Sequence, residues 1–334
     1  MFENAVILVT GGTGSWGHEL VSQLLLQNPR EVIVYSRNES SQVTMMRELD
    51  DARLKFRIGD VRDREALVSV CSRVDYVFHL AALKHVDICE EQPNEALKTN
   101  VGGTQNIIEA AIAGGVKKVI NISTDKAADP VNFYGMTKAI GEKLITYANS
   151  QNSYTRFINV RGGNILGSSG SVLHLFRDQI MEGKQITITD KNMIRYFMTP
   201  QMASGLLLTA ASKGQGGETF ILKMPACKIT DLAQVLIEAY EAQGIEMKEI
   251  GCRPGEKLHE ILISPFESQH AVLLDDHYIV VLPAGNHPQR LQSYASCPSA
   301  SGSPGVSGQS LMTLSEIRSM LADSSLLPIS QTSL

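Results

Sequence analysis

The stretch "AVILVTGGTGSWG" (residues 5–17) decides the fold. It opens with a continuous apolar run, AVILVT, which is typical of a strand buried on both faces of a sheet. Glycines follow in the pattern T-G-x-x-G-x-x-G, and a helix is expected to start near Ser15. Such glycines let the backbone approach a pyrophosphate closely, and the N–H groups of the helix start then face the anion. Strand, glycines and helix together predict a dinucleotide-binding turn.

The chain alternates between strand-like and helix-like segments from this turn to about residue 165. Alternation of this kind predicts an α/β fold, a Rossmann-like doubly wound parallel sheet with helices on both faces. Strands are expected at 5–10, 31–36, 54–59, 75–82, 117–124 and 155–160, and helices notably at 93–113 and 132–149.

The rhythm loosens after residue 165, which predicts a smaller mixed α/β substrate domain built onto the sheet. We expect a cofactor domain at 1–165, joined again by parts of 190–225, and a mainly substrate-binding domain at 166–283. Residues 284–334 read as a Ser/Gly/Pro-rich surface loop or partly disordered segment and a C-terminal helix. Helices are expected near 172–182, 200–211, 230–243 and 313–322, and strands at 185–190, 218–223 and 278–282.

Composition excludes several classes of function. The chain has 334 residues, 43% hydrophobic, with a formal net charge of −5, so it can bury a sizeable core but offers no basic surface for nucleic acid. No apolar run approaches the ~18–20 residues of a membrane span, and the chain enters its first strand without room for a signal peptide. The five cysteines follow no metal pattern, which indicates reduced thiols in a cytoplasmic protein.

The end of the second expected strand bears on the choice of dinucleotide. NAD-binding proteins usually carry Asp or Glu there, to hold the ribose 2′-hydroxyl. This chain has Ser36 and Arg37, with no acid until Glu39. A guanidinium and a hydroxyl suit a 2′-phosphate, so the sequence favours NADP over NAD.

A possible catalytic cluster lies in "STDKAADPVNFYGMTK" (123–138). Tyr134 and Lys138 are four residues apart and share one face of a helix. A nearby cation favours the phenolate, so we expect Lys138 to lower the pKa of Tyr134 from its ordinary ~10. Ser123 and Thr124, at the end of the fifth strand, can hydrogen-bond a substrate oxygen. His79 and His85 are expected to be a core and a loop residue.

These segments resemble the extended short-chain dehydrogenase/reductases, and within them the soluble inverting UDP-N-acetylglucosamine 4,6-dehydratases of bacterial surface-sugar synthesis. The resemblance runs from the N-terminus to about residue 283. The segments that carry it are TGGTGSWG (10–17), VYSRNE (34–39), GDVRD (59–63), AALKHV (81–86), KTNVGGTQN (98–106), STDKAADPVNFYGMTK (123–138), RGGNILGSSGSV (161–172) and RPGEKLHE (253–260).

The resemblance implies catalytic roles. Thr-Asp-Lys at 124–126 matches the inverting branch, whereas retaining relatives carry Thr-Asp-Glu. Tyr134 would accept the proton of the sugar C4 hydroxyl. Lys126 would remove the C5 proton, for which its pKa must fall from ~10.4, and burial and the Lys138 cation are expected to lower it. Asp125 would protonate the departing C6 hydroxyl.

The remaining binding residues are expected around this cluster, with no metal. Two departures from the family pattern, Gly162 in place of an aromatic and Ser169 in place of arginine, affect substrate binding. The expected cofactor contacts are Thr10, Gly11, Gly14, Ser15, Trp16, Gly17, Ser36, Arg37, Asp60, Val61, Ala81, Ala82, Lys84, Asn100, Tyr134 and Lys138. The expected substrate contacts are Lys84, Thr124, Asn164, Arg195, Arg253 and Glu256.

Two other functions stay open on the sequence alone. A C4 epimerase of the same sugar nucleotide would need Tyr134 but neither Lys126 nor Asp125. A non-catalytic NADP sensor would need no Tyr134–Lys138 pair. In every enzymatic reading the partner is a UDP-N-acetylhexosamine. The helices at 93–113 and 132–149 are expected to pair chains into a homo-oligomer, a dimer or hexamer.

Overall fold

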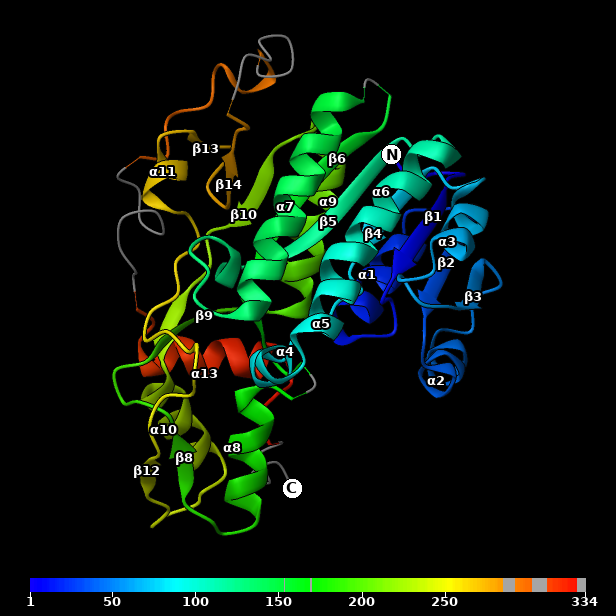
Figure 1. Cartoon of the computed structure of the whole chain (residues 1–334). Coiled ribbons are helices and arrows are strands. Elements are labelled where there is room, and N and C mark those ends of the chain that lie inside the picture. Colours follow the sequence, from blue (N-terminus) through cyan, green and yellow to red (C-terminus); the bar gives the residue numbers. More distant parts are fainter. Residues whose placement is uncertain (153, 169, 285–291, 302–310, 329–334) are drawn as a thin grey trace.

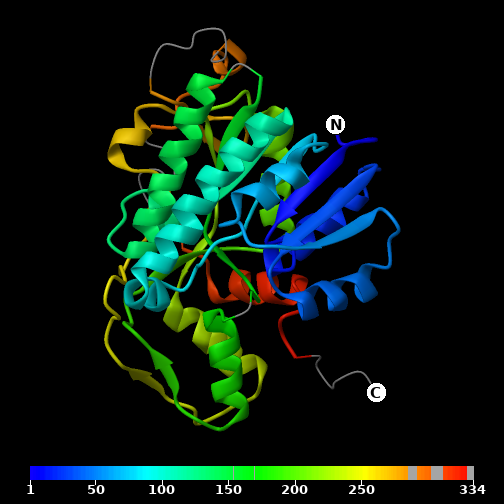
Figure 2. The same ribbon diagram turned by 45° about the vertical axis from the view of Figure 1, so that its right-hand side comes forward.

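The structure of the protein, a computed structural model, describes residues 1–152, 154–168, 170–284, 292–301 and 311–328. A large sheet forms the upper part of the molecule, and a smaller unit built around α8 and α10 lies below it (Figure 1). Turning the molecule by 45° keeps these two parts apart (Figure 2).

The central sheet has nine strands in the order β13-β14-β10-β6-β5-β4-β1-β2-β3. The pairs from β10 to β3 are parallel, while β14 is antiparallel to both β10 and β13. The predicted doubly wound fold is therefore confirmed. The strands are β1 Val6–Thr10, β2 Glu31–Ser36, β3 Leu54–Ile58, β4 Tyr76–His79, β5 Lys118–Thr124, β6 Arg156–Gly162, β10 Thr219–Leu222, β13 Ala271–Leu273 and β14 Tyr278–Val281.

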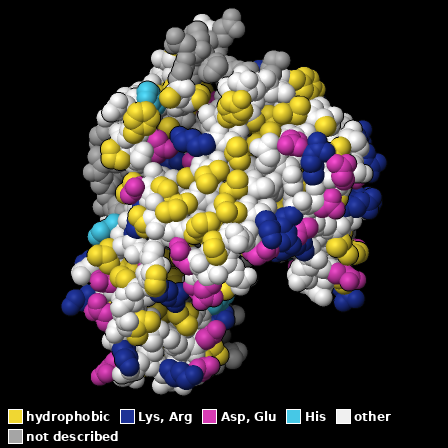
Figure 3. Space-filling view, viewed as in Figure 1, with side chains coloured by type: hydrophobic (Ala, Val, Ile, Leu, Met, Phe, Trp, Pro, Cys, Tyr) yellow, Lys and Arg dark blue, Asp and Glu magenta, His cyan; other side chains and the backbone are white. Residues whose placement is uncertain are grey.

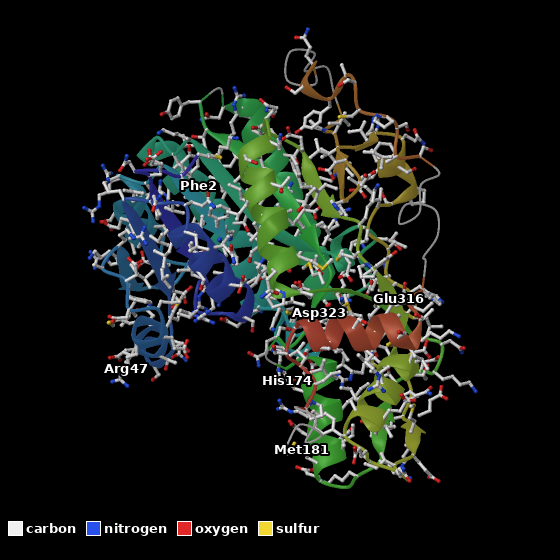
Figure 4. The ribbon with its side chains drawn as sticks, turned by 180° about the vertical axis from the view of Figure 1, so that it is seen from behind. Phe2, Arg47, His174, Met181, Glu316 and Asp323 are labelled. Carbon is white, nitrogen blue, oxygen red and sulfur yellow. The ribbon has the colours of Figure 1, made fainter. Side chains whose placement is uncertain are left out.

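Helices cover both faces of this sheet because successive strand residues point to opposite sides. Buried residues of α3, α6 and α7 form one apolar cluster with one face, and those of α1, α2 and α9 join the other. Figure 4, from behind, shows α9 across that second face. The helices are α1 Ser15–Leu25, α2 Glu39–Leu49, α3 Arg64–Cys71, α6 Gly103–Gly114, α7 Phe133–Gln151 and α9 Pro200–Lys213.

The helix expected at 93–113 is interrupted. It consists of α5 (Pro93–Ala96), a π-helical turn η1 (Leu97–Gly102) and α6. Asn100 lies in this wider turn, and its side chain bonds the Leu83 backbone in a neighbouring loop; π turns are frequent at functional sites. A short helix, α4 (Val86–Glu91), precedes this segment.

The smaller unit has its own apolar core, built from α8, α10, α13 and short strands. In Figure 4, α13, with Glu316 and Asp323 labelled, lies between the main sheet and α8, which carries His174 and Met181. The elements of the smaller unit are β7 Asn164–Ile165, α8 Val172–Met181, β8 Ile186–Ile188, β9 Ile194–Met198, β11 Ala226–Lys228, α10 Ile229–Ala239, β12 Met247–Glu249 and α13 Leu314–Asp323.

Parts of the chain after residue 260 pack into the main core, whereas the sequence predicts a surface loop or partly disordered segment from residue 284 on. β10, β13 and β14 belong to the nine-stranded sheet; the division of the chain into domains stays a prediction. In the described part of the Ser/Gly/Pro-rich segment, Tyr294 and Ala300 are buried in the main core. Tyr294 donates a hydrogen bond to Glu218 at 3.0 Å. The other short helices are α11 Pro265–Ser268 and the 3-10 turns η2 Asp125–Ala127 and η3 Gln292–Tyr294.

Within the part of the chain that the structure describes, no helix has both the length and the apolar character to cross a bilayer.

Candidate active site

The glycine-rich turn is shaped by close packing. Gly11 has φ +69°, and a Cβ there would lie 2.8 Å from the backbone nitrogen of Ala81, so only glycine fits. Gly14 is the N-cap of α1, with no side-chain cap and no acidic residue in the first turn. The start of α1 thus offers backbone N–H groups to an anion. Gly17, Ser15 and Trp16 lie in the same turn and first helical residues, as predicted.

The carboxyl end of β2 carries the residues expected to select the dinucleotide. Ser36 is nearly buried, and its hydroxyl accepts a hydrogen bond from Gln42 at 3.0 Å. Arg37 is exposed, and its guanidinium lies 3.9 Å from the carboxylate of Asp60. Asp60 itself is held by Arg62 at 2.7 Å. Arg37 is therefore the cation with freedom to turn toward a ligand at this strand end.

The carboxyl end of β4 is fixed by buried polar side chains. The Thr10 hydroxyl contacts His79 Nδ1 at 2.8 Å and accepts from the Ala81 nitrogen at 3.3 Å. His79 is a core residue, as expected, and burial lowers its pKa to about 3. Asn100 accepts from the Leu83 nitrogen at 2.8 Å and donates to the Leu83 carbonyl at 3.0 Å. Thr10 and Asn100 thus position the Ala81–Ala82 backbone, and their own side chains are buried.

Asn100 also connects this loop to α7, because it donates to the Thr137 hydroxyl at 3.0 Å. Val61, another expected cofactor contact, is buried, and its carbonyl accepts from Asn106. Lys84 is exposed at the end of the same loop, and His85 is the N-cap residue of α4.

The catalytic candidates meet where β5 ends. The Thr124 hydroxyl donates to Asp125 at 2.8 Å, and the Lys126 ammonium contacts the same Asp125 oxygen at 3.0 Å. Thr124 also hydrogen-bonds Tyr134, and the positive charge of Lys126 acts to lower the pKa of Tyr134. A Cβ at Gly135 would collide with the Lys126 carbonyl, so glycine at this position lets α7 pack directly on the turn that carries Lys126. Asp125 is fully buried, and its second oxygen has no hydrogen-bond partner among the residues that the structure describes.

Two electrostatic predictions are wrong. Burial raises the pKa of Tyr134 to about 12; the cation that opposes this shift is Lys126, not Lys138. Burial would lower the pKa of Lys126, but Asp125 and Glu260 outweigh it, so this pKa is raised. The lysine is an ammonium in the structure as it stands. Lys138 is buried, and burial lowers its pKa to about 8 against the opposing charge of Glu142.

Sequence reasoning missed two groups at this site. Glu260 is 2% exposed, and its carboxylate lies 3.4 Å from Lys126. Arg161, Glu142 and Glu267 form a fully or largely buried ion cluster, with contacts of 2.6 and 2.9 Å, beneath α7. Glu260 is the last residue of the segment RPGEKLHE, so the sequence did offer a signal for it. No motif around Arg161 in the sequence indicates that it forms an ion cluster.

Apart from Lys84 and Thr124, the expected substrate residues lie on β7, on β9 and in the loop that precedes Glu260. Arg195 is buried and donates to the Ile194 and Leu258 carbonyls at 2.9 and 3.2 Å, with Glu256 at 3.4 Å. Glu256 also accepts from the Arg253 nitrogen at 3.1 Å, while the Arg253 side chain is exposed. Asn164, on β7, donates to the Tyr196 carbonyl at 3.0 Å.

The Gly162 departure has a structural explanation. A Cβ there would lie 2.6 Å from the Met198 methyl and 3.0 Å from the Trp16 ring. These two side chains fill the space into which a larger residue would project, so β6 is not left with a hole. Ser169, the second departure, lies outside the described residues.

The fold and the cluster define a class. A glycine-rich turn after β1 and a Tyr134–Lys138 pair beside the end of β5 are the features of an extended short-chain dehydrogenase/reductase. More particularly, the chain belongs to the polysaccharide biosynthesis protein family, whose sequence model matches residues 7–282. This confirms the family and the fold that the sequence predicts.

Known proteins resemble the chain over most of its length. It is 44% identical over 285 residues to the UDP-N-acetylglucosamine 4,6-dehydratase (inverting) of Campylobacter jejuni, covering 84% of each chain. It is 42% identical over 284 residues to a UDP-glucose 4-epimerase of Rickettsia rickettsii, covering 83% of each. Among solved structures, Pen from Bacillus thuringiensis is 39% identical, with a TM-score of 0.89 over 98% of this chain and 99% of that one.

Proposed function

We propose that this protein is an NADP-dependent UDP-N-acetylglucosamine 4,6-dehydratase that inverts C5, acting early in bacterial surface-sugar synthesis. The observation that carries the proposal is the contact of Asp125 and Lys126 with each other beside Tyr134. A dehydratase needs an acid, a base and a proton acceptor at one sugar. The 44% identity to a protein named as this dehydratase supports the same reading.

The residues at the glycine-rich turn fit a dinucleotide. The uncapped start of α1 suits the pyrophosphate, and the close approach of Gly11 to Ala81 keeps the turn free of a side chain at that position. Bound nicotinamide would supply hydride acceptance at C4 and hydride return at C6. We favour NADP because the exposed Arg37 stands where an acid would favour NAD.

Each catalytic side chain then has a task. Tyr134 takes the C4 hydroxyl proton; the Lys126 charge and the contact with Thr124 both favour its phenolate against the effect of burial. Lys126 removes the proton from C5, which the C4 ketone has made acidic. The proton that Tyr134 took passes to Asp125 through the Thr124 hydroxyl, which contacts both side chains, and Asp125 gives it to the C6 hydroxyl as it leaves. C5 is reprotonated from the face opposite Lys126, which inverts it, and Lys126 releases its proton to solvent, so the net change is loss of water.

The loop at 253–260 is the proposed place of the UDP moiety. Arg253 has an exposed guanidinium that can pair with phosphate bidentately. Its backbone is anchored to Glu256, which also contacts Arg195. Asn132, the N-cap of α7, donates to the Gly255 carbonyl at 2.9 Å, and this bond ties the loop to the helix of Tyr134.

An epimerase is the second candidate, because a relative of 42% identity carries that name. Epimerisation at C4 would use Tyr134 and leave Asp125 and Lys126 without a task. Incubation of the purified protein with UDP-N-acetylglucosamine, followed by mass spectrometry, separates the two. A dehydratase gives a product lighter by one water. A product of unchanged mass is that of an epimerase, and unaltered substrate would favour a sensor.

A homo-oligomer is also part of the proposal. The exposed apolar residues Met136, Ile140 and Tyr147 lie along α7, with Leu97 and Ile112 on the neighbouring η1 and α6. Figure 3 shows hydrophobic side chains gathered over this face. Such a stripe suits helix-to-helix pairing of two chains. Ile140→Glu should reduce the assembly to monomers in size-exclusion chromatography, and an unchanged elution would contradict this.

The five free thiols suit a cytoplasmic protein.

A further inference from the structure

Glu260 approaches the catalytic turn from a distant part of the chain. A backbone bridge joins His259 to Ile194, and the Ile194 nitrogen donates to the Leu258 carbonyl at 3.0 Å. This pairing carries residue 260 along the edge of β9 and into the site. Its carboxylate then lies 3.4 Å from the Lys126 nitrogen, while Asp125 contacts the same nitrogen at 3.0 Å.

Lys126 is thus held between two carboxylates that are 0% and 2% exposed. The other charged or titratable groups that face this pair are Arg195 from β9, Lys257 from the same loop, and Tyr134 from α7. The arrangement stabilises the ammonium form of Lys126. A lysine that removes a carbon-bound proton needs a free lone pair, so the proton must leave before the C5 step.

We infer that Glu260 is the proton acceptor that converts the Lys126 ammonium into the base for C5. The inference rests on the proposed dehydratase function and names a residue with a role of its own in it. One proton passes from Lys126 Nζ to Glu260 Oε1, leaving a neutral amine and a neutral carboxylic acid. No other reactant is required, because the pair keeps the same number of protons.

The proton balance then closes over the reaction. The neutral Lys126 takes the C5 proton and becomes an ammonium again, while Glu260 stays protonated. C5 is reprotonated from the opposite face of the sugar once C6 has been reduced, and the Lys126 ammonium releases the proton it took to solvent. Glu260 finally gives its proton back to Lys126, and the ion pair of the resting protein is restored.

Glu260 suits this task better than Asp125. Asp125 Oδ1 already accepts from Thr124 at 2.8 Å, and Asp125 is the proposed acid for the C6 hydroxyl. Glu260 sits in a site where burial raises its pKa, an effect that the Asp125 charge reinforces and Lys126, Arg195 and Lys257 oppose. A raised carboxyl pKa brings the protonated form within reach of a neighbouring ammonium.

The test compares Glu260→Gln with the native protein, with Glu260→Asp, and with Glu249→Gln as an exposed control. Exchange of the C5 hydrogen in deuterated buffer is measured against pH with the cofactor-loaded protein. Internal transfer keeps the proton count constant, so native exchange should not depend on Lys126 losing a proton to solvent. In Glu260→Gln the proton must go to solvent. Exchange should then fall ~10²–10⁴-fold near neutral pH and rise about tenfold per pH unit.

Two further measurements separate this role from a structural one. Nζ resonances of the cofactor-free protein, with Lys126 assigned through Lys126→Ala, should titrate at lower pH in Glu260→Gln, because one of two counter-charges is gone. Glu260→Asp should keep the flat pH profile at a reduced rate, and it carries the test if the glutamine variant fails to fold.

Native exchange in Glu260→Gln, or slow exchange with an unaltered pH profile, would overturn the inference. A sloping profile in Glu260→Asp would do the same. Failure of the proposed function looks different, because the native protein itself would then release no water and exchange no C5 hydrogen.

Discussion

Lys138, on the same helix as Tyr134, offers a direct test of how burial acts on a charged side chain beside the site. Its side chain is 6% exposed, and burial lowers its pKa from 10.5 to about 8. At about 1.4 kcal/mol per pKa unit, this shift is a cost of roughly 3 kcal/mol for keeping the charged lysine in the folded protein. Between pH 8 and 10.5 the unfolded chain binds the proton and the folded chain does not. The free energy of unfolding should therefore rise with pH in this window.

Lys138→Met removes the charge and keeps much of the volume. The stability advantage of the methionine variant over the native protein should shrink by roughly 3 kcal/mol between pH 7 and pH 10.5. The contributions of the other titrating groups to the free energy of unfolding cancel when the two proteins are compared. Urea unfolding at one fixed protein concentration measures it, because association also affects apparent stability.

Lys138→Arg is the matched control, since a guanidinium stays charged throughout this range. It should show no gain in the free energy of unfolding relative to Lys138→Met as the pH rises. A difference between native protein and Lys138→Met that is constant with pH would refute the reasoning. An Nζ resonance of Lys138 with a midpoint near 10.5 would refute it as well.

Three further changes test other parts of the account. Arg37→Ala should weaken NADP(H) binding by roughly 1–3 kcal/mol more than NAD(H) binding, and equal native affinities for both cofactors in calorimetry would contradict the assignment. Tyr134→Phe should abolish hydride transfer from C4 but retain cofactor affinity; substantial turnover would remove Tyr134 from its role. Arg161→Met leaves Glu142 and Glu267 without their buried partner, so urea unfolding should show a loss of about 3–5 kcal/mol, and a neutral result would mean that the cluster is replaceable.

Local signals in the sequence were sufficient for much of the fold. The apolar runs and the glycine turn mark β1 and α1, and β2 has the predicted bounds of 31–36. Helix spacing also places Tyr134 and Lys138 on one helix, α7. These features depend on neighbours within a few residues, and such neighbours are visible in a sequence.

What escaped prediction depends on contacts between distant segments. Glu260 reaches Lys126 because the loop before it pairs with β9, and its charge adds to the larger effect of Asp125 in raising the Lys126 pKa. Arg161 meets Glu142 and Glu267 only when β6, α7 and the loop at 262–267 come together. Tyr294 joins the core by bonding Glu218, 76 residues earlier. Residue type and spacing alone do not specify such partners.

The most direct test of the central claim follows the sugar C5 in deuterated water. Native protein supplied with NADP and UDP-N-acetylglucosamine should release one water and give a 4-keto-6-deoxy product with inverted C5 and deuterium at that carbon, seen by mass spectrometry and NMR. Lys126→Ala should still permit reversible hydride transfer at C4, yet give little product and no C5 exchange in recovered substrate. A native product of unchanged mass, or native dehydration and exchange in Lys126→Ala, would contradict the account.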